Sequence, residues 1–99
     1  MSTTASTPNE HAPVDPVLFW RPGCPYCHGL QRALDVAGVA IAEVNIWERP
    51  EAAALVRAVA GGNETVPTLL VGHEALVNPD PEVAIAAIAA HRGAHPRGA

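Results

Sequence analysis

The sequence predicts an α/β fold in which a small mixed sheet of four strands has helices on both faces. Short apolar segments alternate with stretches whose apolar residues recur at helical spacing, in the order β-α-β-α-β-β-α. A helix joins the first two strands, which makes them parallel, whereas a short turn joins the last two into a hairpin. With 99 residues, of which 48% are apolar, the chain is long enough for one domain with one modest core.

The first strand is predicted over residues 17–20, a continuous apolar run typical of a strand that is covered on both faces. The first helix begins at Pro25, because proline suits the first helical position, where its missing N–H is not needed. Leu30 and Leu34 share one face of this helix, and Gly38 ends it.

Alternating side chains predict the second strand over residues 40–46. The second helix begins at Arg49 and ends at Gly61, and its predicted buried face consists of Leu55, Val56 and Val59. The third strand is predicted over residues 65–71, and residues 75–77 return beside it as the fourth strand.

The last helix is predicted to begin after Asn78 or Asp80, since both are good caps and a proline follows each. Its apolar residues go nearly all round the helix, so it should be well buried on the sheet. The domain should therefore span residues 14–92. A disordered N-terminal arm, residues 1–13, is rich in Ser, Thr and Ala, and a flexible tail occupies residues 93–99.

The charge and the cysteine count restrict the class of protein. A net charge of −4 argues against a nucleic-acid partner, and no apolar run approaches the length of about eighteen residues that a membrane span needs. The first residues lack the pattern of a signal peptide. Two cysteines cannot build a disulfide framework, so we expect them to serve chemistry in the reducing cytoplasm, in a monomer without a membrane partner.

The two cysteines, Cys24 and Cys27, lie where the first strand ends and the first helix begins. A helix N-terminus carries a partial positive charge and unpaired N–H groups, which favour a thiolate. Cys27 falls on the inward stripe of the helix with Leu30 and Leu34, which leaves Cys24 at an exposed tip. The two thiols should therefore be unequal, with Cys24 reacting first. We expect neither a resident metal nor a bound cofactor.

Two motifs, Cys-Pro-Tyr-Cys at residues 24–27 and Thr-Val-Pro at residues 65–67, stand in the expected elements. With this element order the chain resembles the glutaredoxin family of the thioredoxin superfamily, from about residue 17 to residue 90, and within it looks most like the mycoredoxins. The resemblance implies a thioredoxin-like fold, Cys24 as nucleophile and Cys27 as resolving thiol. It also implies a cis peptide bond before Pro67, which turns the backbone of Val66 toward the substrate groove.

The resemblance and the local pattern together predict the site residues. The thiolate should be stabilised by Arg21, whose charge lies beside Cys24, and by the helix start at Pro25 and Tyr26. Residues expected to bind the substrate or its thiol are Trp20, Tyr26, Thr65, Val66, Pro67 and Asn78. Trp47 could line a substrate groove, but packing at a strand end is the favoured interpretation. His28 is expected to be an exposed residue of the first helical turn rather than a residue that tunes Cys24.

The predicted activity is a glutaredoxin-type thiol–disulfide oxidoreductase. It would reduce mixed disulfides between proteins and a low-molecular-weight thiol, or protein disulfides, with that thiol as co-substrate. Glutaredoxins that hold glutathione usually carry a Gly-Gly-Cys-Ser/Thr-Asp-like stretch before the last helix. Here the stretch from Gly72 to Asp80 lacks it, so mycothiol fits better than glutathione.

Four alternatives use the same residues. One is a redoxin that a thioredoxin-reductase-type flavoprotein reduces, such as an electron donor to ribonucleotide reductase. Another is an iron–sulfur cluster shared between two chains through Cys24, which the proline after that cysteine disfavours. Cys-x-x-Cys-His at residues 24–28 is also a c-type haem motif, and a zinc site would need Cys24, Cys27, His91 and His95.

Overall fold

The computed structural model describes residues 16–94, so the predicted arm at residues 1–13 and the end of the tail lie outside the described residues. The central sheet has the strand order β2-β1-β3-β4. Strand β1, Val17–Trp20, pairs in parallel with β2, Ala42–Asn45, and antiparallel with β3, Thr68–Val71. Strand β4, Glu74–Val77, completes the predicted hairpin with β3.

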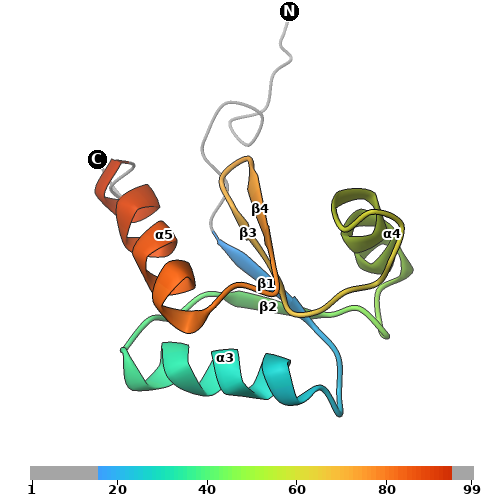
Figure 1. The fold of residues 1–99 in the computed structure, drawn as a ribbon, viewed down its shortest axis with the longest axis horizontal. Coiled ribbons are helices and arrows are strands. Elements are labelled where there is room, and N and C mark those ends of the chain that lie inside the picture. The colour runs from blue at the N-terminus through green and yellow to red at the C-terminus, as the bar shows by residue number, and fades with distance from the viewer. Residues whose placement is uncertain (1–15, 95–99) are drawn as a thin grey trace, which may run out of the picture.

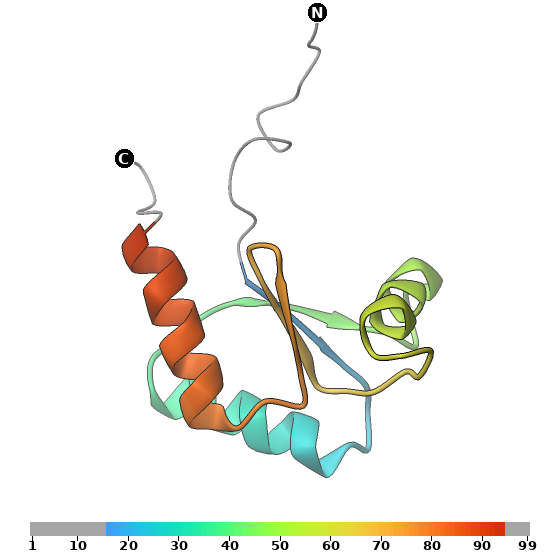
Figure 2. The same cartoon turned by 45° about the horizontal axis from the view of Figure 1, so that its top comes forward.

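Three helices cover the two faces of this sheet, as the sequence predicts (Figures 1 and 2). Helix α3, Pro25–Val36, and helix α5, Pro81–Ala94, lie together on one face, and helix α4, Pro50–Val59, lies on the other. The structure is therefore a thioredoxin-like α/β fold. Within residues 16–94 we find no helix with the length and apolar character of a membrane span.

Alternation along β1 divides the core into two clusters, because successive side chains of a strand point to opposite faces. Leu18 packs with Leu30 and Leu34 of α3 and with Ile88 of α5. Its neighbour Phe19 faces the other side, where the cluster also contains Ile46, Ala52, Ala53 and Val56. Helix α3 is thereby fixed against the strand that precedes it, which places its N-terminus at the end of β1.

The structure corrects the predicted buried face of α4. The residues that face the sheet are Ala52, Ala53 and Val56, whereas Leu55 and Val59 are 40% and 38% exposed. Phe19 and Ile46 already fill this face of the sheet, so the helix packs through the side that carries small alanines. Only Val56 of the predicted stripe is buried.

Helix α5 is less buried than its composition predicts. Ala84 and Ile88 are buried, but Val83 is 52% exposed. The reason is that α5 packs on the sheet with one face only, and its opposite face meets solvent. The helix also runs to Ala94, beyond residue 92. Strand β2 spans only residues 42–45 of the predicted 40–46, and β3 begins at Thr68 because residues 65–67 form a separate turn.

Candidate active site

Cys24 caps helix α3 with its own sulfur. Gly23 adopts a positive φ of 75°, and Cys24 is extended, so the chain enters the helix with the Cys24 side chain turned over the first helical turn. The N–H of Cys27 donates a hydrogen bond of 3.3 Å to the Cys24 sulfur. The sulfur thus occupies the place that a serine or aspartate oxygen takes in most helix caps, and the helix N–H favours negative charge on it.

A second segment closes over the same sulfur from far along the chain. The Cys24 thiol donates to the carbonyl oxygen of Val66 at 3.6 Å, and the Val66–Pro67 peptide bond is cis, as the resemblance implies. The loop is held by two further hydrogen bonds. The N–H of Asn78 donates to the Pro67 carbonyl at 2.7 Å, and the Thr68 hydroxyl donates to the Thr65 carbonyl at 2.8 Å.

Both thiols are buried, which corrects the prediction that Cys24 lies at an exposed tip. Cys24 is 3% exposed and Cys27 is fully buried. Cys24 does lie at the helix start, but the Val66 backbone reaches over it. The inward position of Cys27 is confirmed.

The pKa of Cys27 is far from that of an ordinary thiol. Burial raises the pKa of Cys27 to about 12, and its hydrogen bond with Cys24 adds to the increase. A backbone hydrogen bond with Arg21 and the positive charge of that residue act in the opposite direction but do not cancel the effect. Cys27 is therefore a neutral thiol near pH 7, whereas Cys24 is the thiol whose sulfur accepts the helix N–H.

One ring–ring contact and one cation–ring contact involve residues next to the Cys24–Cys27 motif in the chain and the nearby Trp47. The Trp20 and His28 rings lie 6.2 Å apart between centroids, and the guanidinium carbon of Arg21 lies over the Trp47 ring, 5.7 Å from its centroid. Trp47 is 64% exposed, so its expected packing at a strand end is wrong.

Trp47, which contacts Arg21, is not among the predicted substrate-binding residues. Because β1 and β2 are parallel and Trp20 pairs with Asn45, the residues that follow them leave the sheet side by side. The hydrogen bond from the Ile46 N–H to the Trp20 carbonyl, 2.9 Å, continues this pairing past the strand ends. The one signal in the sequence is an arginine directly after one predicted parallel strand and a tryptophan shortly after the other; the register that brings the two together comes from the structure.

The other predicted residues are placed as follows. Tyr26 is 70% exposed on the first turn of α3, beside Pro25, which holds the first helical position. Asn78 reaches the Pro67 loop through its backbone, while its side chain is exposed. Arg21, Val66, Pro67 and Thr65 are gathered around the dithiol or in the loop that covers it.

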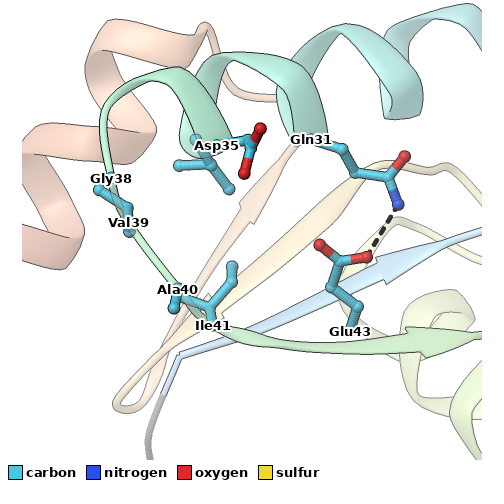
Figure 3. Close-up of a pocket in the computed structure, with 8 residues that line it drawn as sticks. Gln31, Asp35, Gly38, Val39, Ala40, Ile41 and Glu43 are labelled. Carbon is cyan, nitrogen blue, oxygen red and sulfur yellow. Dashed lines mark hydrogen bonds between the residues drawn. The ribbon is translucent and has the colours of Figure 1, made fainter.

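A pocket of about 350 Å³ lies away from the predicted site, between the second half of α3 and the start of β2 (Figure 3). Its lining includes Gln31, Asp35 and Glu43, and no predicted site residue. The Gln31 amide donates to Glu43 across this pocket at 3.0 Å, and the His28 ring nitrogen Nδ1 lies 3.0 Å from the Gln31 oxygen. His28 is exposed, as expected.

The described part of the chain offers no metal site of the usual kind. Within residues 16–94, no three His, Cys, Asp or Glu side chains come close enough together to hold a metal ion. His91, one proposed zinc ligand, belongs to α5 and joins no such group, and His95 lies outside the described residues.

Comparison with known proteins agrees with the geometry of the fold and the dithiol. The sequence profile of the glutaredoxin family matches residues 17–76. No curated protein matches the sequence.

Solved structures add similarity over most of the chain. The NrdH-redoxin of Escherichia coli is 25% identical with a TM-score of 0.62, covering 72% of this chain and 91% of its own. The glutaredoxin of Brucella melitensis is 26% identical with a TM-score of 0.61, covering 89% and 95%. The glutaredoxin of Archaeoglobus fulgidus, 18% identical with a TM-score of 0.64 and coverage of 83% and 94%, shares the fold. Because the family profile covers more than half of its residues, this chain belongs to the glutaredoxin family.

Proposed function

We propose that this protein reduces mixed disulfides between proteins and a low-molecular-weight thiol, and protein disulfides, through the thiolate of Cys24. One observation carries the proposal: the Cys24 sulfur lies between the helix N–H of Cys27 and the backbone of Val66. The first supports negative charge on the sulfur, and the second offers a polar backbone group beside the point of attack. We place the activity in the cytoplasm, where thiols are kept reduced.

The chemistry is thiol–disulfide exchange at Cys24. The Cys24 thiol loses its proton to solvent, and its sulfur attacks the sulfur of the low-molecular-weight thiol in the mixed disulfide. The substrate protein leaves as a thiolate and takes up a proton. A new disulfide now joins Cys24 to the small thiol, and a second small thiol or Cys27 releases it.

The high pKa of Cys27 favours release by a second small thiol. A buried neutral thiol is a poor nucleophile, because the thiolate is the species that attacks. Cys27 resolves Cys24 when no small thiol is available or when the substrate is a protein disulfide. In that case its proton leaves, the Cys24–Cys27 disulfide forms and the protein substrate gains two electrons.

We propose mycothiol as the small thiol. The segment before α5 lacks the stretch with which glutaredoxins usually hold the γ-glutamyl end of glutathione. In its place Asp80 stands at the start of α5, where its carbonyl accepts the Ala84 N–H at 2.9 Å, and Glu82 follows in the first turn. Mycothiol has no γ-glutamyl end, so its binding does not require that stretch.

A second candidate is a redoxin reduced by a thioredoxin-reductase-type flavoprotein. It is favoured by the 25% identity with the NrdH-redoxin of E. coli, which is described as having a thioredoxin-like activity profile. Turnover with mycothiol and its reductase, compared with turnover with thioredoxin reductase alone, separates the two candidates. We expect the first system to support faster reduction of a mycothiolated protein; faster reduction by thioredoxin reductase alone would favour the second candidate.

A further inference from the structure

The contact between Arg21 and Trp47 is a feature of the site that dithiol chemistry alone does not require. The Arg21 guanidinium lies over the exposed Trp47 ring, 5.7 Å from the guanidinium carbon to the ring centroid. Its Nη1 also donates to the Pro22 carbonyl at 3.2 Å. A cation over an aromatic face is attracted by the ring, and the guanidinium keeps its remaining N–H groups for a planar anion.

The backbone of Trp47 is fixed in turn. The Trp47 N–H donates a hydrogen bond of 2.9 Å to the Asn45 side-chain oxygen. The N–H of the preceding residue, Ile46, donates to the Trp20 carbonyl. Ile46 is buried, which anchors this turn in the core below α4. These hydrogen bonds therefore hold the backbone that carries the Trp47 ring, and the exposed ring forms a platform for the Arg21 guanidinium.

The guanidinium on this platform has no carboxylate partner within residues 16–94. The two ion pairs found there join Arg49 to Glu51 and Arg57 to Glu64. Arg21 is three residues from Cys24, and its charge acts on the dithiol, where it opposes the increase in the Cys27 pKa. In a chain with a net charge of −4, this unpaired cation beside the reacting sulfur points to an anionic group on the substrate.

We propose that Trp47 is a positioning residue that holds Arg21 to bind an acidic side chain next to the cysteine of a protein substrate. The preferred substrates would then be disulfides in acidic peptide segments. This inference rests on the proposed function, because it concerns the substrate of the same dithiol. It concerns the protein half of the mixed disulfide and is independent of which small thiol forms the other half.

A pair of synthetic pentapeptides tests this inference. Each contains one cysteine activated as a 2-pyridyl disulfide, flanked by two aspartates in one peptide and by two asparagines in the other. Cys24 attacks the peptide sulfur, the Cys24–peptide disulfide forms, and 2-thiopyridone leaves with the proton of the Cys24 thiol. The absorbance of 2-thiopyridone gives the rate, and the ratio of the Asp to the Asn rate reports the charge preference without depending on folding or on tryptophan fluorescence.

The wild-type protein at low salt should prefer the Asp peptide by about two- to five-fold, the factor expected for one exposed charge interaction. Arg21→Gln should abolish or reverse this ratio, because the remaining net charge repels the peptide. Trp47→Ala should lower the ratio toward that of Arg21→Gln, whereas Trp47→Phe, which keeps an aromatic face, should retain most of it. Trp47→Ala should lower the ratio no further when Arg21→Gln is already present.

A matched control is Val36→Ala, at an exposed residue that is 79% accessible at the far end of α3 and should leave the ratio at the wild-type value. A wild-type ratio of one would overturn the inference, and so would a loss in Trp47→Ala that persists undiminished beside Arg21→Gln. Failure of the proposed function has a different signature: neither peptide would react faster with the wild-type protein than with Cys24→Ser.

Discussion

The sulfur of Cys24 lies 3.6 Å from the carbonyl oxygen of Val66, although 42 residues separate the two in the chain. This contact joins the start of α3 to the loop before β3, and it places the Val66 backbone against the buried thiol that we propose as the nucleophile. We therefore expect a substrate to approach along the Val66 backbone, beside the exposed Tyr26 and near Arg21. The dithiol is thus enclosed, and we expect its surroundings to contribute to selection of the substrate.

The raised pKa of Cys27 predicts a loss of stability at alkaline pH. The ordinary thiol pKa of 9.0 applies to the unfolded chain, whereas in the folded protein it is about 12. Between these values the unfolded chain releases this proton and the folded protein keeps it. The stabilising effect of the buried neutral thiol is therefore complete below pH 9 and declines as the pH rises toward 12, by up to about 1.4 kcal/mol per pH unit.

Urea unfolding of the reduced protein across this pH window measures the effect, with Cys27→Ser as the control, since serine does not titrate there. The difference in unfolding free energy between wild type and variant should be constant below pH 9 and change in favour of the variant above it. A difference that stays constant throughout the window would contradict the assigned pKa.

Two substitutions in α5 test the corrected burial of that helix. Ile88 is 1% exposed and lies in the cluster with Leu18 and Leu30, so Ile88→Ala should cost about 2–5 kcal/mol of unfolding free energy. Val83 is 52% exposed, and Val83→Ala should change it by no more than about 0.5 kcal/mol. Thermal or urea unfolding measures both, and equal losses would mean that α5 is buried on both sides.

A pair of glycines tests the turn between β3 and β4. Gly72 has a φ of +61°, and an added Cβ would lie 3.3 Å from the His91 ring, so Gly72→Ala should destabilise the protein by about 1–2 kcal/mol. Gly29 is the matched control, because it lies within α3 with no atom near an added Cβ. Gly29→Ala should stabilise the protein by about 0.5–1 kcal/mol. Chemical denaturation measures both changes in unfolding free energy. An unchanged stability of Gly72→Ala would contradict the close approach of the turn to α5.

Local patterns predicted the parts of the site that depend on neighbouring residues. The start of α3 at Pro25, the end of that helix before Gly38 and the inward position of Cys27 follow from capping and helical spacing, and the structure confirms them. The cis bond before Pro67 came from the family resemblance and is also confirmed.

Contacts between distant segments were beyond these patterns. The burial of Cys24 arises from Val66, and no local signal shows how closely that loop approaches. Helix α4 has two apolar stripes, and the sequence pattern favours burial of the one with the larger side chains. The stripe that contains Ala52 and Ala53 packs on the sheet instead, because Phe19 and Ile46 leave room only for small side chains. The exposure of Trp47 likewise depends on the pairing of β1 with β2.

The identity of the nucleophile is tested most directly by trapping the first covalent intermediate. Reduced Cys24→Ser and Cys27→Ser variants are incubated with a mycothiolated protein, and mass spectrometry locates the mycothiol that each variant acquires. We predict one mycothiol on Cys24 of Cys27→Ser, with the substrate protein reduced, and neither transfer nor reduction by Cys24→Ser. Transfer of mycothiol to Cys27 in Cys24→Ser, with a yield equal to that at Cys24, would contradict the assignment of Cys24 as the nucleophile.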